Sequence, residues 1–228
     1  MATYVITGAN RGIGLEFVRQ LLARGERVLA TCRDPQHSKA LAALACDRLS
    51  VHSVDVASTE SVRAFADALH TEPVDVLINN AGIFGPDNQS FGRTDYDGWL
   101  ALLNTNTLGP LRVLEALAPN LERGARKLAV TITSGMGSIG DNTSGGYYPY
   151  RSSKAAVNMV MRSASVDLRG RGITVVVINP GWVKTDMGGP GASISPTESI
   201  AGMLRVFDGL TLEKTGTFLD YRGGTFEW

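Results

Sequence analysis

A glycine-rich stretch near the start of the chain lies between a strand-like run and a helical pattern, and it comprises Thr7-Gly8-Ala9-Asn10-Arg11-Gly12-Ile13-Gly14. The residues before it, Tyr4-Val5-Ile6, suit a buried strand. The apolar residues after it recur at the spacing of one helix face. This order predicts a strand, a tight turn and a helix. The free N–H groups and the positive dipole end of such a helix favour bound phosphate groups.

Three glycines in this stretch have separate expected tasks. Gly8 can take a positive φ in the turn, and Gly12 has no Cβ to keep the backbone away from a pyrophosphate. Gly14 lets the helix pack close to the strand. A glycine motif alone also fits an ordinary tight turn, because such motifs gain meaning only from their context. The rest of the chain therefore has to decide between the two interpretations.

Strand patterns alternate with helical patterns along the chain. Further strands are expected at residues 27–31, 49–54, 74–78, 128–133, 173–178 and, more weakly, 218–221. Helices are expected after Ser58, at residues 99–103, 107–121 and 150–168, and after the capping box that begins at Ser195. Such alternation predicts an α/β fold with a doubly wound (Rossmann) parallel sheet and helices on both faces. We expect a single dinucleotide-binding and catalytic domain over residues 1–228, with ligands beyond the carboxyl ends of the strands.

Composition excludes several functional classes. The 22 Lys and Arg residues balance 22 Asp and Glu residues, so no surface for nucleic acid or an anionic membrane is expected. Hydrophobic residues make up 43% of the chain without a run long enough to cross a bilayer. The strand pattern starts close to Met1 and the two cysteines are too few for a disulfide framework, so we expect a cytoplasmic protein with free thiols. The three histidines lack metal-ligand spacing, and no metal site is expected.

The strongest chemical signal is the run Tyr150-Arg151-Ser152-Ser153-Lys154. Positions four apart share a helix face, so the phenol of Tyr150 and the ammonium of Lys154 should point the same way. A nearby positive charge favours the phenolate, and we expect it to pull the pKa of Tyr150 below the usual ~10. Tyr150 would then be able to exchange a proton with a substrate oxygen near neutral pH. Tyr147, with Arg151 four residues on, remains an alternative.

Several motifs together resemble the short-chain dehydrogenase/reductase family. They are the TGxxxGIG stretch at residues 7–14, the NNAG run at residues 79–82, and the Tyr150 and Lys154 pair. Three further runs resemble the C-factor branch, which is similar to carbonyl-reductase-like members: NTNTLGPLR around Asn106, TSGMGSIG at residues 133–140 and PGWVKTDMGGPG at residues 180–191. The resemblance implies NADP(H)-dependent reduction of a carbonyl compound to an alcohol, with tyrosine as general acid. A C-factor-like signalling or sensor protein that binds NAD(P) with little turnover is the alternative.

The resemblance also assigns cofactor contacts. The phosphates would meet the glycine turn, the adenine would meet the end of the third strand, and the nicotinamide end would meet the run after the sixth strand. The implied cofactor-binding residues are Gly8, Asn10, Arg11, Gly12, Ile13, Gly14, Arg33, Asp55, Val56, Asn80, Ala81, Gly82, Tyr150, Lys154, Pro180, Gly181, Val183 and Thr185.

The end of the second expected strand favours NADP(H) over NAD(H). An enzyme that prefers NAD usually has a carboxylate there for the ribose 2′-hydroxyl. This chain has Cys32 followed by Arg33. Arg33 and Arg11 suit a 2′-phosphate, because guanidinium groups bind phosphate in a bidentate manner. Asp34 follows directly, so NAD(H) is not excluded.

Ser134 and Asn106 complete the implied catalytic set. Ser134 follows the fifth expected strand, where the family has a serine that gives the substrate oxygen a second hydrogen bond. Ser138 lies nearer the usual spacing from Tyr150 and remains an alternative. Asn106 matches the family asparagine that holds a proton-relaying water. Asn104 is the alternative to Asn106. A purely structural explanation of both residues is a polar kink in the helix.

The remaining expectations concern the lid and the partners. Small residues from Gly188 to Ala192 occupy the place of a mobile segment in the family, so a substrate lid is expected around residues 183–196. The implied partner is a small carbonyl or alcohol substrate. A homodimer through the helices at residues 107–121 and 152–168 is expected from resemblance alone. A serine hydrolase is disfavoured because no Gly-x-Ser-x-Gly elbow occurs.

Overall fold

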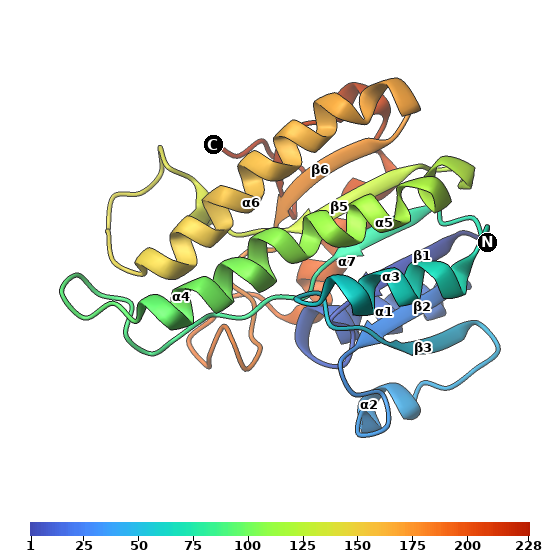
Figure 1. Cartoon of the computed structure of the whole chain (residues 1–228), viewed down its shortest axis with the longest axis horizontal. Coiled ribbons are helices and arrows are strands. Elements are labelled where there is room, and N and C mark those ends of the chain that lie inside the picture. The colour runs from blue at the N-terminus through green and yellow to red at the C-terminus, as the bar shows by residue number, and fades with distance from the viewer.

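A seven-stranded parallel sheet forms the centre of the computed structural model, which describes residues 1–228 (Figure 1). Its strands are β1 (Thr3–Thr7), β2 (Arg27–Cys32), β3 (Leu49–Ser53), β4 (Val76–Asn79), β5 (Leu128–Ile132), β6 (Thr174–Asn179) and β7 (Phe218–Asp220). They lie in the order β3-β2-β1-β4-β5-β6-β7, and every neighbouring pair is parallel. The order reverses between β1 and β4, which is the switch point where doubly wound sheets bind ligands. The predicted fold class is confirmed.

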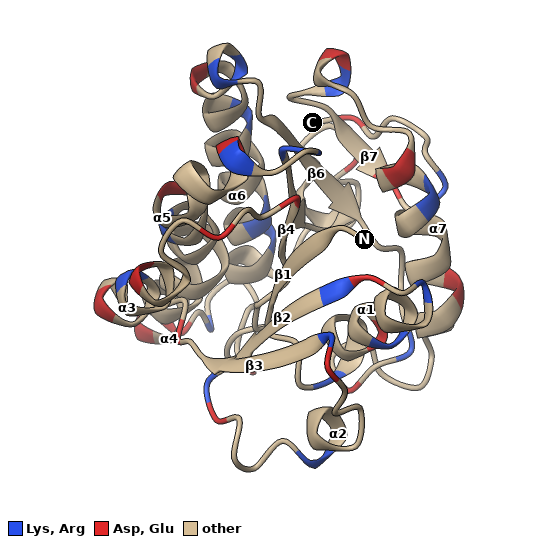
Figure 2. Ribbon diagram, turned by 90° about the vertical axis from the view of Figure 1, so that its right-hand side faces the viewer, with Lys and Arg blue, Asp and Glu red and all other residues tan.

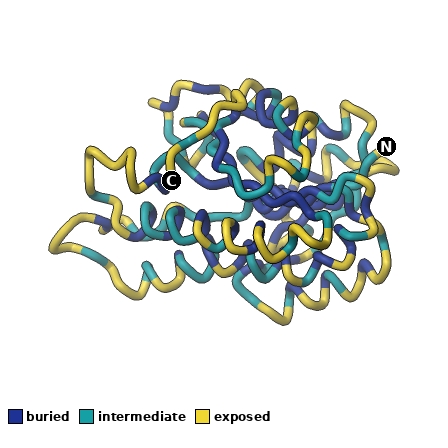
Figure 3. The backbone as a smooth tube through the Cα atoms, turned by 90° about the horizontal axis from the view of Figure 1, so that it is seen from above, coloured by how far each residue is buried: buried dark blue, intermediate teal, exposed yellow.

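Helices cover both faces of the sheet, as Figure 2 shows. One face carries α1 (Gly12–Ala23), the short α2 (Lys39–Ala42) and α7 (Pro196–Asp208). The other carries α3 (Thr59–Leu69), α4 (Tyr96–Leu103), α5 (Gly109–Arg123) and α6 (Tyr148–Asp167). Apolar side chains fill a separate core layer on each face. The central strands between these layers are almost entirely buried, whereas the edge strand β3 is only partly buried (Figure 3).

The helix starts follow the predicted chemistry. Ser58 caps α3 by accepting the Ser61 N–H at 3.2 Å, and Ser195 caps α7 by accepting the Glu198 N–H at 3.1 Å. Each cap satisfies a backbone donor that the first helical turn leaves unpaired. The capping signals at both serines are therefore confirmed.

Some boundaries differ from the prediction for local reasons. β4 begins at Val76, two residues later than predicted, although the Asp75 N–H still donates to the Thr3 carbonyl oxygen at 2.9 Å. The carboxylate of Asp75 also accepts the N–H groups of Thr3 and Ala125 at 2.8 and 2.7 Å. The two helical stretches predicted between residues 99 and 121 are joined by a π-helical turn at Asn104–Leu108. The four-residue α2 is absent from the prediction, because it is shorter than a periodic pattern can reveal.

The connections that follow β4 and β5 extend beyond the helices at one end of the molecule (Figure 1). They lie beyond the carboxyl ends of the parallel strands, where the predicted site residues also lie. None of the helices is sufficiently long and apolar to cross a bilayer.

Candidate active site

The turn between β1 and α1 has the predicted glycine geometry. Gly8 has a φ of 65°, and a Cβ on Gly14 would lie 2.3 Å from the Gly8 carbonyl oxygen. Arg11 occupies the N-cap position of α1 with an extended backbone, and no side chain caps this helix. The first N–H groups of α1 therefore have no side-chain acceptor. They suit an anionic group.

The run after β4 is fixed to this turn by the side chains of Thr7 and Asn80. The Thr7 hydroxyl accepts the N–H groups of Asn80 and Ala81, both at 3.0 Å. The Asn80 amide donates to the carbonyl oxygens of Thr7 and Gly8 at 2.9 and 3.0 Å. The amide nitrogen of Asn80 is thus used within the protein, and it joins the carboxyl ends of β1 and β4.

At the end of β2, Arg33 and Asp34 have different surroundings. Oδ2 of Asp34 lies 2.6 Å from Nδ1 of His37, and the His37 N–H donates to Oδ1 of Asp34 at 3.2 Å. The hydrogen bond from the His37 side chain holds the pKa of Asp34 below its usual value. Arg33 is exposed and has no ion-pair partner. The Asp34 carboxylate, which kept NAD(H) open, therefore already has one hydrogen-bonding partner, in an exposed contact with His37.

At the end of β3, Asp55 and Val56 are partly used by the protein. Oδ1 of Asp55 accepts the Ala57 N–H at 3.0 Å, and the carbonyl oxygen of Val56 accepts a hydrogen bond from Arg112 at 3.1 Å. The Val56 side chain is buried. Both residues lie beyond the same sheet edge as the glycine turn.

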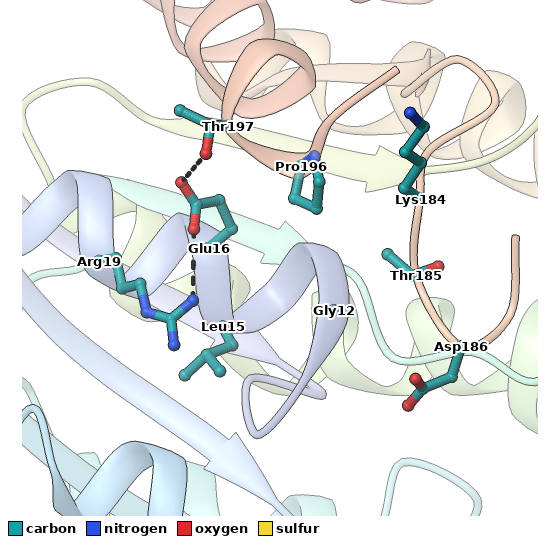
Figure 4. Close-up of a pocket in the computed structure, with 9 residues that line it drawn as sticks. All are labelled: Gly12, Leu15, Glu16, Arg19, Lys184, Thr185, Asp186, Pro196 and Thr197. Atoms are coloured by element: carbon teal, nitrogen blue, oxygen red, sulfur yellow. Dashed lines mark hydrogen bonds and ion pairs between the residues drawn. The ribbon is translucent and has the colours of Figure 1, made fainter. Parts of the chain in front are cut away.

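The predicted lid segment faces the start of α1 across a pocket. A pocket of about 360 Å³ separates them and is lined by Gly12, Leu15, Glu16, Arg19, Lys184, Thr185, Asp186, Pro196 and Thr197 (Figure 4). Arg11 forms an ion pair with Asp186 at 3.7 Å across this region. On the far side, Oε1 of Glu16 accepts a hydrogen bond from the Thr197 hydroxyl at 3.1 Å.

The two ends of the predicted lid segment are joined by backbone hydrogen bonds. The Lys184 N–H donates to the Ile194 carbonyl oxygen at 2.8 Å, and the Ile194 N–H donates to Trp182 at 3.1 Å. Before it, the Gly181 N–H donates to Oδ1 of Asn179 at 3.2 Å, and the Pro180 carbonyl accepts from Ser199 at 2.6 Å. Residues 183–194 thus leave and rejoin the body of the protein at one point.

Tyr150 and Lys154 share one face of α6, as predicted from their spacing. Both residues are buried, and Nζ of Lys154 lies 5.8 Å from the centre of the Tyr150 ring. Nζ also donates to the Ile132 carbonyl oxygen at 3.1 Å. Tyr147, the alternative, is half exposed, and Arg151 donates to Ser144 and Gly145 instead of approaching it.

Burial governs the protonation of this pair. It raises the pKa of Tyr150 to about 12 and lowers the pKa of Lys154 to about 8. The predicted fall in the pKa of Tyr150 is therefore wrong for the protein without cofactor. Burial away from water destabilises the charged phenolate and raises the pKa of Tyr150. Ser134 is the one neighbour that lowers this pKa, and its effect is smaller. The phenol is consequently protonated at neutral pH.

The two candidate serines face different partners. Ser134 follows β5 and accepts the Met136 N–H at 3.1 Å. Its hydroxyl lies near enough to the Tyr150 phenol to lower the pKa of that group. The Ser138 hydroxyl accepts the Asp141 N–H at 3.1 Å and donates to the Trp228 carbonyl oxygen at 3.4 Å. The geometry places Ser134 beside the phenol, whereas Ser138 holds a connection together.

The two candidate asparagines also separate, at the π-helical turn between α4 and α5. Asn106 donates to the Ile83 carbonyl oxygen at 2.8 Å and to the Ser153 hydroxyl at 3.2 Å, and it accepts the Ile83 N–H at 2.9 Å. Asn104 instead donates to Ala57 and accepts from Arg112. The π-helical turn thus places Asn106 against α6, the helix that carries Tyr150 and Lys154.

Comparison with known sequences decides the family. The sequence model of the short chain dehydrogenase family matches residues 2–193. The chain belongs to the short-chain dehydrogenase/reductase family. It is 50% identical over 167 residues to the C-signal protein of Myxococcus xanthus. The match covers 73% of this chain and 100% of that protein. The predicted family and enzyme class, an oxidoreductase, are thereby confirmed.

Solved short-chain dehydrogenase/reductase structures are also similar. The carbonyl reductase Sniffer of D. melanogaster has 31% sequence identity and a TM-score of 0.94, with both chains covered in full. A carbonyl reductase from chicken fatty liver, solved with bound NADPH, has 36% identity and a TM-score of 0.92, covering 100% of this chain and 99% of that one.

Two residues of this short-chain dehydrogenase/reductase lie at the site without having been predicted there. The ring centre of Phe84 lies 4.7 Å from that of Tyr150, and the buried Gln89 accepts the Tyr150 N–H at 3.0 Å. Tyr147, just before the helix, is a poor N-cap residue, which signals that the helix needs an acceptor from elsewhere. No sequence spacing indicates which distant side chain supplies it.

Proposed function

We propose that this short-chain dehydrogenase/reductase uses NADP(H) to reduce a carbonyl compound to an alcohol. The observation that carries the proposal is the buried Tyr150 and Lys154 pair, with Ser134 beside the phenol. A buried titratable pair with shifted pKa values, at the same sheet edge as the glycine turn, is typical of a catalytic site. The similarity to a carbonyl reductase solved with NADPH supports the same assignment.

The residues of the glycine turn fit a dinucleotide. α1 has no side-chain cap, so its first N–H groups suit the pyrophosphate. Arg33 has no ion-pair partner and Asp34 is bound to His37, which favours a 2′-phosphate over a bare ribose hydroxyl. When bound, the nicotinamide supplies the hydride. We assign the contacts to Gly8, Asn10, Arg11, Gly12, Ile13, Gly14, Arg33, Asp55, Val56, Asn80, Ala81, Gly82, Tyr150, Lys154, Pro180, Gly181, Val183 and Thr185.

Tyr150 acts as the general acid in this proposal. Its pKa of about 12 keeps the proton on the phenol at neutral pH, which is the form that protonates a carbonyl oxygen during reduction. Ser134 donates a second hydrogen bond to the same oxygen and stabilises the charge that develops there. Lys154 binds the cofactor ribose, and Asn106 holds the water that returns a proton towards Lys154.

The segment at residues 183–196 is proposed to be a substrate lid on one catalytic unit that spans residues 1–228. Its support is the ion pair between Arg11 and Asp186, which joins the segment to the glycine turn. Cofactor phosphates bound at Arg11 would compete for this ion pair and change the position of the lid. Trp182 and Met187, both about half exposed, would then face the substrate.

A second function is favoured by one observation, the 50% identity to the C-signal protein. In this alternative the protein binds NADP(H) as a signalling or sensor protein and turns over little substrate. The distinction is measurable because both functions predict cofactor binding but only one predicts carbonyl-dependent consumption of NADPH.

A homodimer is proposed through the helices at residues 107–121 and 152–168, which carry exposed apolar side chains. Leu108, Met159 and Val166 are each at least 46% exposed. Scattered apolar residues are normal on a surface, but several on adjoining helices suit contact with a second copy. Light scattering in solution distinguishes a dimer from a monomer.

The test of the proposed function is a panel of aldehydes and ketones supplied with NADPH. We expect consumption of NADPH with at least one carbonyl compound, and binding of NADPH in fluorescence titration. Binding without consumption across the panel would favour the signalling alternative. Absence of binding would contradict both functions.

A further inference from the structure

The helix that carries Tyr150 has no cap of its own. Its N-cap residue, Tyr147, has a left-handed backbone with φ of 50° and ψ of 40°, and its side chain makes no capping hydrogen bond. The preceding Gly145 and Gly146 are also left-handed, with φ of 62° and 63°. Helices normally begin at an extended residue whose side-chain oxygen accepts the N–H two or three positions later. The sequence at this helix start cannot provide that acceptor.

Gln89 provides it from the connection that follows β4. Its Oε1 accepts the Tyr150 N–H at 3.0 Å, and its main-chain oxygen accepts the Tyr148 N–H at 3.1 Å. Tyr150 is the third residue of α6, the position that an N-cap side chain ordinarily serves. Gln89 is 4% exposed and stands 61 residues before Tyr150, so the bond joins two distant segments.

The same side chain also positions an aromatic neighbour of the phenol. Nε2 of Gln89 donates to the Phe84 carbonyl oxygen at 3.0 Å. The ring centre of Phe84 lies 4.7 Å from that of Tyr150 and 5.7 Å from that of Tyr147. Thus one buried amide holds both the backbone of the tyrosine and the residue whose ring packs against it.

We propose that Gln89 is a positioning residue, which sets the phenol of Tyr150 relative to Phe84 and Ser134 without touching the substrate. The inference rests on the proposed carbonyl reduction. A displacement of about 1 Å in a reacting group can cost on the order of a hundredfold in rate. A loosened start of α6 would move the phenol by this mechanism, because Tyr150 lies in the first turn of the helix.

Two substitutions separate the contributions of this amide. Gln89→Met keeps the length of the side chain but removes the acceptor for Tyr150 and the donor for Phe84. Gln89→Glu keeps an oxygen that can accept the Tyr150 N–H in either protonation state, so it serves as the conservative rescue. Asn120→Leu is the matched control. Asn120 is another buried amide, and it donates to His70 and Glu72 at 3.1 and 2.8 Å, in the connection between α3 and β4.

The experiment measures kcat, KM, the isotope effect with 4-deuterated NADPH, and NADPH affinity by fluorescence. For Gln89→Met we expect kcat to fall roughly 10- to 100-fold, a larger isotope effect, and NADPH affinity within about twofold of the wild type, because the glycine turn is unchanged. Gln89→Glu should recover most of kcat. Asn120→Leu should leave kcat unchanged although it also removes buried hydrogen bonds.

Amide hydrogen exchange of the cofactor-free protein gives an answer that does not depend on turnover. We expect faster exchange at residues 148–153 in Gln89→Met and not in Asn120→Leu. Unchanged exchange there, or a loss of kcat equal to that of Asn120→Leu, would overturn the positioning role. Absence of carbonyl turnover in the wild type would instead refute the proposed function, while the exchange result would still decide whether Gln89 holds the helix start.

Discussion

Lys154 is tied to the sheet as well as to Tyr150: its Nζ donates to the carbonyl oxygen of Ile132 at 3.1 Å while lying 5.8 Å from the centre of the phenol ring. Ile132 is the last residue of β5, and Ser134 follows it two residues later. One strand end therefore supplies both the anchor for the ammonium and the serine beside the phenol. Helix α6 is held in register with that strand end, so the proposed acid, its charged neighbour and the second donor are placed together.

Replacing Tyr150 with phenylalanine tests the general acid. The aromatic ring and its packing against Phe84 are retained, but the transferable proton is removed. We expect kcat/KM for carbonyl reduction to fall by about 10²- to 10⁴-fold, with NADPH affinity nearly unchanged in fluorescence titration. Tyr148→Phe is the control, because Tyr148 is partly exposed and belongs to the same helix start. Retained turnover in Tyr150→Phe would refute the role assigned to this phenol.

The two serines provide a matched comparison. Ser134→Ala removes the hydroxyl beside the phenol, and we expect kcat to fall by about 10²- to 10³-fold, as for loss of an oxyanion donor. Ser138→Ala removes a hydroxyl bound to Asp141 and Trp228, so it should change thermal stability more than kcat. Steady-state kinetics and thermal unfolding of both variants check this. A larger loss of kcat in Ser138→Ala would reverse the assignment.

Lys154 should make the protein less stable than a neutral substitute would. Its pKa in the folded state is about 8, below the ordinary 10.5, so the unfolded chain binds more protons between those values. Stability contributed by this group therefore rises as pH rises from 8 to 10.5. We expect Lys154→Met to raise the free energy of unfolding near pH 7 by up to roughly 3 kcal/mol, and the gain to shrink towards pH 10.5.

The same substitution should remove activity, because the ammonium is the proposed ribose ligand. Denaturant unfolding at several pH values measures the first effect and NADPH oxidation measures the second. A variant that is less stable than the wild type at pH 7 would show that the hydrogen bond to Ile132 outweighs the cost of burying the charge.

Cofactor preference should depend on Arg33. Arg33→Asp replaces a free guanidinium by a carboxylate, and we expect NADPH to bind about 10- to 100-fold more weakly, since a hydrogen bond to a charged group contributes about 1.5–3 kcal/mol. NADH should bind no more weakly than before. Parallel titrations with the two cofactors measure the change, and Arg93→Asp, in the connection after β4, is the charge-matched control. An unchanged ratio of affinities would place the 2′-phosphate elsewhere.

Much of the fold was predictable because its signals are local. The apolar runs of the strands, the glycines at residues 8 and 14, and the serines at residues 58 and 195 each depend on near neighbours in sequence. The pairing of Tyr150 with Lys154 was also predictable, because a helix fixes which residues share a face.

What the sequence did not reveal depends on burial and on distant segments. The pKa of Tyr150 rises because desolvation outweighs the neighbouring groups, and a count of nearby charges cannot measure desolvation. Gln89 caps a helix that begins far along the chain, and His37 occupies Asp34 through a loop contact. The partners of Ser134 and Ser138, and of Asn106 and Asn104, also come from distant segments, so the sequence did not show how these residues differ.

The Thr7 hydroxyl, which accepts two consecutive N–H groups from Asn80 and Ala81, joins the two central strands at the switch point of the sheet. The turn that we propose binds the nucleotide is therefore fixed to the two central strands by side-chain hydrogen bonds. The segments that would contact a substrate, by contrast, belong to the three long connections after β4, β5 and β6. We expect substitutions in those connections to change the proposed substrate contacts while leaving the proposed cofactor turn unchanged.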